Sequence, residues 1–470
     1  MLTWDDFITG SVESTCAYTK WGIFLAKKRT IYVCESCGYE SPRWFGRCPS
    51  CGEWNTAKHL AIEPEKGSEF ERLEPIPIIE VPDTETERIP TGFVELDRIL
   101  GGGIVPGSVV LIGGEPGIGK STLMMQVSAS LASKGNVYYV SGEESAAQLK
   151  SRAGRLKALR ENLYLSPDPT VDRVMKNFSS PLLVVFDSLQ TMRVSTTETL
   201  PGSVSQVRDS VMKVMEMAKR KGVAIFLVGH VTKEGQIAGP KLVEHLVDVV
   251  IYFEGEQREE LRVLRTVKNR FGPSGEVALF EMTDTGLKEI TNPSAILPSE
   301  LSGAPGVAFG VTVEGTRPIC IEIQALVSKT QFGAPRRTAL GVDPARLTVL
   351  SAVLARHLKL PLEYRDIYVG VMGGLRITDP TTDLSLAGAI LSSFFDIPLP
   401  PATSLIGEIG LDGGVRASSS FSKRLKVAGS SGFKRVWGPE ASDGAVGIEL
   451  VRIDHVRELG RLLTSLAREG

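Results

Sequence analysis

The chain has 470 residues, of which 42% are hydrophobic and 23% are charged, and its formal net charge is −2. This length allows about three domains with cores of their own. The net charge excludes a nucleic-acid-coating protein that is basic over its whole surface, though not a local basic channel. The sequence has no apolar run of the roughly 18 residues that a membrane span needs and no secretory signal pattern, so we expect a cytoplasmic protein.

Two Cys-x-x-Cys pairs, ten residues apart, are the first clear feature along the chain. Tetrahedral Zn²⁺ favours soft thiolate ligands, and a site closed by four of them leaves no position for a catalytic water. A disulfide framework would be unusual in so long a chain, and the remaining alternative is reduced cysteines without metal. We therefore predict a structural zinc module over residues 25–60, with the ligands Cys34, Cys37, Cys48 and Cys51.

Cationic and aromatic side chains surround these cysteines: Arg43, Trp44, Phe45, Arg47 and Trp54. Together they would suit stacking on single-stranded bases. A small zinc module also needs aromatic side chains for its own core, and we favour this packing for Trp44 and Trp54.

An acidic, proline-rich segment follows. Residues 61–90 contain nine acidic and three basic residues and five prolines. Proline resists helix formation and like charges repel, so we predict an extended linker.

From about residue 91 to residue 292, short apolar runs alternate with amphipathic stretches. This alternation predicts buried strands in a mostly parallel sheet that helices cover on both faces. A second linker is expected at 293–300, and residues 301–465 mix strands and helices in an α+β pattern. The overall expectation is a multidomain α/β protein. The expected core strands are Val109–Ile112, Val137–Val140, Leu182–Phe186, Ala224–Val228 and Val249–Phe253.

A complete phosphate-binding P-loop follows the first of these strands and opens a helix. Its glycines let backbone N–H groups surround phosphates, and the helix N-terminus adds a positive dipole end. Lys120 should reach the β- and γ-phosphates, the Ser121 hydroxyl should ligate Mg²⁺, and Thr122 should contact the α-phosphate. The residues expected to bind the nucleotide are Gly114, Glu115, Pro116, Gly117, Ile118, Gly119, Lys120, Ser121 and Thr122.

Acidic residues at strand ends complete the predicted ATPase site. Asp187 ends the strand Leu182–Phe186, the position of a carboxylate that helps to hold Mg²⁺. Hydrolysis also needs a group that orients or deprotonates water. Glu143 follows the strand Val137–Val140 and is the favoured base, while its neighbour Glu144 could exchange roles with it.

Three segments of this sequence closely resemble the bacterial RadA (Sms) family of DNA repair proteins. They are Arg88–Gly107, Tyr139–Ser145 and the pentapeptide Lys-Asn-Arg-Phe-Gly at 268–272, and the similarity runs from about Leu25 to about Leu463. The resemblance implies a RecA-like ATPase core and a homohexamer that binds single-stranded and branched DNA. It also implies a DNA-dependent motor that moves branches beside the RecA recombinase. The alternatives are an ATP-dependent protease and a regulatory ATPase switch without motor activity.

Lys268 and Arg270 form a basic pair after the expected strand Arg262–Val267. In RecA-class rings such residues reach the γ-phosphate of the neighbouring subunit, where a cation stabilises charge on the transferred phosphoryl group. The alternative is a solvated strand end.

Two loops would line the centre of such a ring, at Arg193–Arg208 and Val231–Lys241. Lys233 and Lys241 in the second loop suit contacts with DNA phosphates. His230 lies between a strand and this loop and could sense the γ-phosphate; a core histidine is the alternative.

Residues 301–465 resemble the proteolytic domain of Lon proteases, for instance at Gly407–Gly413. An ungapped match places Thr382 at the Lon nucleophile, with Ser385 nearby, and Ser422 at the Lon base, with Lys423 one residue late. A Ser–Lys dyad needs direct hydrogen-bond reach, so we expect no peptidase activity. We expect an assembly platform with a DNA-facing surface; the candidate contacts are Lys329, Arg336 and Arg337.

The RadA family typically opens with Met-Ala-Lys-Lys ahead of the zinc module, where this chain has Leu25, Ala26, Lys27 and Lys28. A TTG codon can start translation in bacteria and reads as Leu internally. We therefore expect residues 1–24, which lack a clear helical or strand period, to result from a misplaced start site. A genuine arm that docks on a partner is the alternative.

Overall fold

The computed structural model describes residues 29–34, 39–62, 77–80, 87–196, 202–230, 241–255, 260–292, 297–298, 301, 303–331, 333–418, 420–439 and 447–469. Residues 1–24, Cys37 and Lys233 therefore lie outside the described residues. The chain divides into two compact units, residues 1–82 and 83–470. Within the described ranges, no helix combines the length and apolar character that crossing a bilayer requires.

The first unit contains a small antiparallel sheet with the strand order β2-β1-β3. Cys34 ends β1 and pairs with Ala57 at the start of β3, so the sheet brings the two ends of the cysteine-containing segment together. The bounds are β1 (Arg29–Cys34), β2 (Glu40–Ser41), β3 (Ala57–Ile62) and the 3-10 helix η1 (Ile78–Glu80).

The second unit begins with a sheet of order β12-β11-β10-β9-β4-β8-β7-β5-β6. Strands β9 to β6 in this order are parallel, and β10, β11 and β12 extend the sheet with antiparallel pairs. This confirms the predicted mostly parallel core. The bounds are β4 (Val109–Gly114), β5 (Asn136–Ser141), β6 (Leu163–Ser166), β7 (Pro181–Asp187), β8 (Ala224–His230), β9 (Val249–Glu254), β10 (Leu261–Asn269), β11 (Val277–Thr283) and β12 (Gly286–Glu289).

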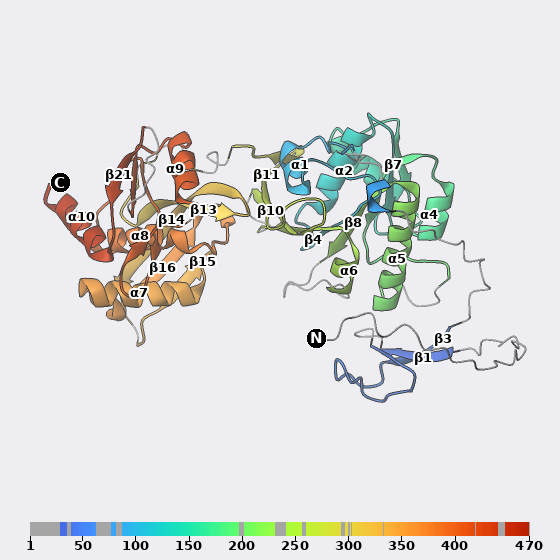
Figure 1. Ribbon diagram of the computed structural model, residues 1–470, viewed down its shortest axis with the longest axis horizontal. Helices are drawn as coiled ribbons and strands as arrows, with labels where there is room; N and C mark the ends of the chain where they lie inside the picture. Colours follow the sequence, from blue (N-terminus) through green and yellow to red (C-terminus); the bar gives the residue numbers. More distant parts are fainter. Residues whose placement is uncertain are drawn as a thin grey trace, which may run out of the picture. The chain divides into compact units, whose positions relative to one another are not determined.

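Helices cover both faces of this sheet (Figure 1). Along β4, Val110 and Ile112 pack in one hydrophobic core, whereas Val109 and Leu111 pack in the other, as the two-residue period of a strand requires. One face carries α1 (Val94–Leu100), α2 (Lys120–Leu131) and α3 (Ala146–Arg155); the other carries α4 (Val171–Asn177), α5 (Val204–Lys221) and α6 (Lys241–Leu246).

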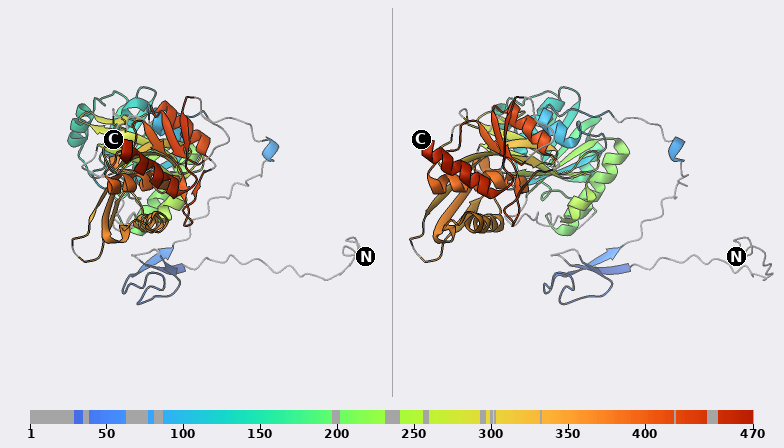
Figure 2. Two further views of the ribbon diagram at one scale, coloured as in Figure 1. Left: turned by 90° about the vertical axis from the view of Figure 1, so that its left-hand side faces the viewer. Right: turned by 60° about the vertical axis from the view of Figure 1, so that its left-hand side comes forward.

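The C-terminal part is an α+β domain around a mixed sheet of order β15-β16-β14-β13-β17-β20-β21. Helix α8 is buried along most of its length, and α10 packs on α7 and α8 (Figure 2). The strands are β13 (Val307–Glu314), β14 (Arg317–Lys329), β15 (Arg337–Leu340), β16 (Arg365–Val371), β17 (Thr403–Leu405), β18 (Glu408–Ile409), β19 (Val415–Arg416), β20 (Arg435–Gly438) and β21 (Glu449–Arg452). The helices are α7 (Pro344–Leu358), α8 (Asp383–Phe395), α9 (Phe421–Ser430) and α10 (Val456–Glu469), with 3-10 turns η3 (Leu362–Tyr364), η4 (Met372–Gly374) and η5 (Pro380–Thr382).

Charged side chains join the turn between β13 and β14 to the ATPase core. Arg317 pairs with the buried Glu95 of α1, and Glu276 accepts the Thr316 N–H at 3.0 Å. Arg98 bridges both carboxylates, at 3.0 Å from Glu95 and 2.7 Å from Glu276. Because two arginines share two buried carboxylates, this network is fixed more firmly than an isolated surface pair would be.

Candidate nucleotide site and zinc centre

The predicted P-loop connects the end of β4 to the start of α2. Gly117 and Gly119 have φ values of +79° and +120°, in the left-handed region that favours glycine. A Cβ on Gly119 would come within 2.7 Å of the Met282 Cε atom, so the flexible end of Met282 would have to move to admit a side chain. The loop thus runs directly into the N-terminus of a twelve-residue helix. Backbone N–H groups of the loop and of the first helical turn suit phosphate binding.

Lys120 begins α2 and turns its ammonium group back onto the loop. Its Nζ donates hydrogen bonds of 2.7 Å to the carbonyls of Gly114 and Glu115. Burial lowers the pKa of Lys120 to about 8, although the nearby carboxylates of Asp187, Glu143 and Glu115 oppose this effect. The side chain is therefore mostly charged at neutral pH and lies among the residues predicted to bind the nucleotide. Ser121 and Thr122 follow in the first turn of α2 and are partly buried.

Asp187 is the last residue of β7, and the sheet places it at the same edge as the P-loop. It pairs with Ser141 of β5, and Gly114 pairs with His230 of β8. The buried Tyr139 hydroxyl donates a hydrogen bond of 2.6 Å to Asp187 Oδ2. Burial, reinforced by Asp187, raises the Tyr139 pKa well above its usual value, so the phenol remains a proton donor.

Glu143 and Glu144 point to different partners. Glu143 Oε1 accepts a hydrogen bond from Ser188 Oγ and lies 3.3 Å from His230 Nε2. Glu144 instead pairs with Arg152 of α3, and its backbone N–H donates to Ser141 Oγ at 3.1 Å. Glu143 thus belongs to the group of polar residues around Lys120 and Asp187, and Glu144 is directed toward α3.

His230 ends β8 and contacts this group directly through Glu143. Its ring is partly exposed, with 32% of the side-chain surface accessible, so it is not a fully buried core histidine. Residues 231–240, which follow it in the chain, lie outside the described residues. Lys241 begins α6, and its side chain likewise is not described.

Lys268 and Arg270 lie at the opposite edge of the sheet from the P-loop of their own chain. The strand was expected to end at Val267, but β10 continues to Asn269 because Lys268 and Asn269 still pair with β9, after a bulge. Lys268 Nζ donates to the carbonyls of Glu244 (3.0 Å), His245 (3.0 Å) and Val247 (2.8 Å). Arg270 pairs with Asp248 at 3.0 Å and remains 48% exposed.

Three of the predicted zinc ligands lie together in the first unit. The sulphur atoms of Cys34, Cys48 and Cys51 are all within 4.8 Å of one another, and those of Cys34 and Cys51 are 3.7 Å apart. Sulphur atoms ~2.3 Å from a tetrahedral zinc ion would be separated by about 3.8 Å, so these thiolates fit the metal. Cys37, the fourth predicted ligand, lies outside the described residues.

Packing was the favoured role for Trp44 and Trp54, and that expectation is wrong. Their accessible fractions are 62% and 69%. The Arg47 guanidinium lies 5.9 Å from the Trp54 ring centre, the geometry of a cation–π contact. Phe45 packs edge-on against Tyr39 and is the partly buried aromatic residue of this loop.

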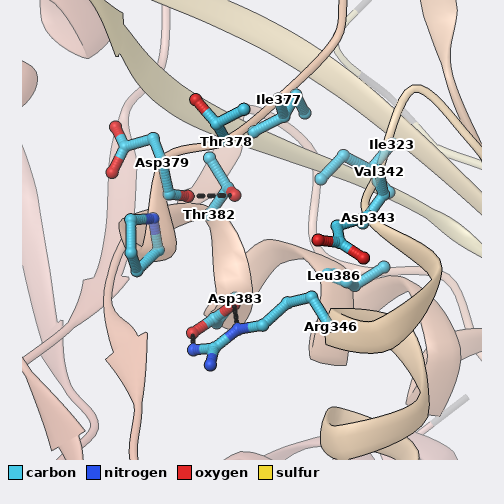
Figure 3. A pocket seen from close by; sticks show the side chains of 11 residues that line it. Ile323, Val342, Asp343, Arg346, Ile377, Thr378, Asp379, Thr382, Asp383 and Leu386 are labelled. Carbon is cyan, nitrogen blue, oxygen red and sulfur yellow. Dashed lines mark hydrogen bonds and ion pairs between the residues drawn. The ribbon is translucent and has the colours of Figure 1, made fainter. Parts of the chain in front are cut away.

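The C-terminal domain has a pocket of about 200 Å³ beside Thr382, at the start of α8 (Figure 3). Thr382 Oγ1 donates to the Asp379 carbonyl at 2.7 Å. In the same pocket, Arg346 pairs with Asp383 (Figure 3). The hydroxyl of Ser385 is bound to the Thr382 carbonyl at 2.8 Å.

The residues matched to the Lon base lie on α9, where Ser422 and Lys423 are both exposed. The next residue, Arg424, is buried and pairs with Asp379 at 2.6 Å. Neither Thr382 nor Ser422, the residues matched to the Lon dyad, takes part in this ion pair, and Arg424 stays protonated and cannot act as a base.

The proposed DNA contacts of this domain differ in their surroundings. The Arg337 guanidinium donates to the carbonyls of Arg365 and Leu362, and so is tied to the domain backbone. The side chains of Arg336 and Lys329 are exposed. Arg336 anchors its own segment through its backbone N–H, which donates to Asp366 at 2.8 Å.

Sequence reasoning missed three residues that contact the candidate site. Tyr139 binds Asp187, Ser188 binds Glu143, and Arg262 donates to the Ile118 carbonyl in the P-loop at 3.0 Å. The available signal was an arginine within the predicted strand Arg262–Val267, because an arginine in a buried strand needs specific partners.

Comparisons with known proteins match two parts of the chain to family models. Residues 75–236 match the model of an AAA domain, and residues 32–58 match the rubredoxin metal binding domain. The chain therefore contains a P-loop ATPase domain and a cysteine cluster of the zinc-ribbon type. A crystal structure of the RadB recombinase is 22% identical, with a TM-score of 0.35, and covers 43% of this chain and 98% of its own.

Several curated proteins match nearly the whole chain. The DNA repair protein RadA of Bacillus subtilis is 46% identical over 458 residues, which cover 94% of this chain and 100% of the relative. The RadA proteins of Halalkalibacterium halodurans (47%) and Listeria monocytogenes (45%) each cover 89% of this chain and 94% of their own length. At this identity and coverage, the chain belongs to the RadA family of DNA repair proteins.

Proposed function

We propose that the protein is a DNA-dependent ATPase that translocates on single-stranded DNA as a homohexamer and promotes branch migration in recombinational repair beside the RecA recombinase. Its family and its ATPase domain support this reading. The proposed ring is supported by one observation, the position of Lys268 and Arg270 in the sheet.

In the sheet register, Gly114 is level with Phe253 and Leu264, whereas Val110 is level with Val249 and Asn269. The step from Leu264 to Asn269 spans about 16 Å at ~3.3 Å per residue. Lys268 and Arg270, which we propose act as a finger on the neighbouring subunit, are thus too far away to contact phosphates in the P-loop of their own chain. A head-to-tail neighbour could receive them, and repeated head-to-tail contacts close into a ring.

The proposed chemistry assigns one role to each polar group. Lys120 would contact the β- and γ-phosphates, Thr122 would contact the α-phosphate, and Ser121 and Asp187 would hold Mg²⁺. Tyr139 occupies Asp187 Oδ2, so the other carboxylate oxygen would face the metal and its waters. Magnesium, when bound, would offset negative charge on the phosphates.

Glu143 is the proposed base, because its carboxylate lies with Lys120 and Asp187 whereas Glu144 is paired with Arg152. His230 Nε2 lies 3.3 Å from Glu143 Oε1, the oxygen that also accepts the Ser188 hydrogen bond, and His230 directly precedes the predicted DNA-contacting loop Val231–Lys241. A change at the γ-phosphate would therefore reach this loop through His230, with Lys233 and Lys241 contacting DNA. Lys268 and Arg270 would stabilise transition-state charge in the neighbouring site.

The exposed Trp44 and Trp54, together with Arg47, supply a further surface that suits single-stranded bases. We propose that the zinc module is structural and presents this surface. The C-terminal domain would serve assembly and contact DNA through Lys329 and Arg336, without peptidase activity.

ATP turnover with and without single-stranded DNA tests this function most directly. A motor should turn over ATP faster with DNA and should move the junction of a branched substrate only while hydrolysing ATP. A rate of ATP turnover that does not change when DNA is added would instead indicate a regulatory switch. ATP-dependent degradation of an unfolded protein would indicate a protease.

A further inference from the structure

Arg262 places a buried guanidinium group directly beneath the P-loop. The residue lies near the start of β10 and is only 3% exposed. Its Nε donates a hydrogen bond of 3.0 Å to the Ile118 carbonyl, and its Nη1 donates to the Leu261 carbonyl at 2.9 Å. Burying a guanidinium is costly, so its contacts must be specific.

The bonded carbonyl belongs to the peptide group that joins Ile118 to Gly119. In a planar trans peptide, the C=O and the N–H point in opposite directions. Arg262 holds the Ile118 carbonyl toward the β10 side, so the Gly119 N–H is turned the other way. Gly119 is the residue immediately before α2, where N–H groups of a P-loop face phosphates.

The surroundings make this orientation depend on Arg262. Ile118 packs in the same core as Leu264 and Phe253, so the loop rests on the antiparallel part of the sheet. Gly119 has a φ of +120°, a conformation that is easily altered because glycine also populates other regions. The hydrogen bond that Arg262 donates to the Ile118 carbonyl removes this conformational freedom of the Ile118–Gly119 peptide.

We propose that Arg262 is a positioning residue that sets the Ile118–Gly119 peptide for phosphate binding. It prepares the loop before the nucleotide arrives, and so contributes to affinity rather than to the chemical step. This inference concerns nucleotide binding by one subunit and does not depend on DNA translocation or on a ring.

The experiment compares Arg262→Met and Arg262→Lys in the full chain. Methionine keeps much of the volume but loses the donor, so affinity for ADP and ATP should fall about tenfold or more. The KM for ATP should rise correspondingly while kcat at saturation stays within about twofold, the pattern of lost uniform binding. Lysine retains a cationic donor of similar reach and should restore most of the affinity.

Arg265→Met is the matched control, because Arg265 lies three positions further along β10 and pairs with Glu254 and Glu314 instead. It should lower thermal stability and leave ADP affinity near that of the unchanged protein. Thermal melting establishes that each variant is folded. If Arg262→Met binds ADP normally, or if Arg262→Lys is as defective as a folded Arg262→Met, the proposal is wrong.

Discussion

The buried hydroxyl of Tyr139 donates a hydrogen bond of 2.6 Å to Asp187 Oδ2, at the edge of the sheet where the P-loop begins. Asp187 is the residue proposed to help hold Mg²⁺. Tyr139→Phe removes the donor and leaves the carboxylate less firmly oriented, as loss of an outer partner commonly does at metal sites. The Mg²⁺ concentration for half-maximal ATP turnover should therefore rise about tenfold.

A titration of ATPase rate against Mg²⁺ at fixed ATP measures this effect. Tyr138→Phe is the control, because Tyr138 is the adjacent residue of β5 and its hydroxyl bonds the Ser179 carbonyl at 3.2 Å instead. An equal shift in both variants, or none in Tyr139→Phe, would show that the hydroxyl does not orient Asp187.

Glu143 and Glu144 should respond differently to the same substitution. Glu143→Gln removes the proposed base and should slow hydrolysis at least ~10²-fold while ATP still binds. Glu144→Gln weakens the partly exposed pair with Arg152 and should change the rate only about twofold. Single-turnover hydrolysis and nucleotide binding together separate the chemical step from affinity. Normal hydrolysis by Glu143→Gln would move the role of base to another residue.

Much of the core follows from sequence pattern alone, because buried parallel strands read as apolar runs. The observed β4 contains the expected Val109–Ile112 and continues through Gly113 and Gly114. The sequence placed Gly114 in the P-loop, but both glycines remain paired with β8 and β9. Strand ends depend on such partners, which a single sequence does not specify.

The contacts around the site could not be predicted for a related reason. Tyr139 meets Asp187 only because β5 and β7 are neighbours in the sheet, and Arg262 meets Ile118 across 144 positions of the chain. Similarly, whether Trp44 packs or lies exposed depends on how the few residues of the zinc module share its small interior. The P-loop was predictable because its glycines and lysine act within one short segment.

ATP affinity should fall as pH rises through about 8. Burial lowers the Lys120 pKa to about 8 in the nucleotide-free chain. Bound phosphates favour the charged ammonium and raise that pKa, so above pH 8 binding must take up a proton. The affinity is therefore fully present below pH 8 and decreases above it.

Equilibrium binding of ATP between pH 6.5 and pH 9.5 checks this sign. Lys120→Arg is the control, because its guanidinium stays protonated over this range and should remove the dependence. If the ATP affinity of the unchanged protein stays constant or increases above pH 8, binding is not coupled to protonation of Lys120 as proposed.

Mixed oligomers test whether Arg270 acts on the neighbouring subunit. Arg270→Ala keeps an intact P-loop, and Lys120→Ala keeps an intact finger. Each variant alone should be inactive, whereas a mixture contains interfaces with one intact P-loop and one intact finger and should recover part of the ATPase rate. Native mass spectrometry establishes that the subunits have mixed. No recovery in demonstrably mixed oligomers would rule out a finger that acts in trans.

Removing zinc should disrupt the first unit and spare the ATPase core. The three described sulphur atoms fit a tetrahedral ion, so about one Zn²⁺ per chain should be found. Small zinc modules fold with their metal, so Cys48→Ser should lose zinc and make residues 29–62 sensitive to protease. Because residues 83–470 form a separate compact unit, ATP turnover without DNA should persist.

Cys320→Ser is the control: Cys320 is buried in the C-terminal domain, and burial raises the pKa of its thiol to about 11, so it is a poor ligand. This variant should keep its zinc and a protease-resistant first unit, and a metal-free chain whose first unit stays resistant would refute the zinc site.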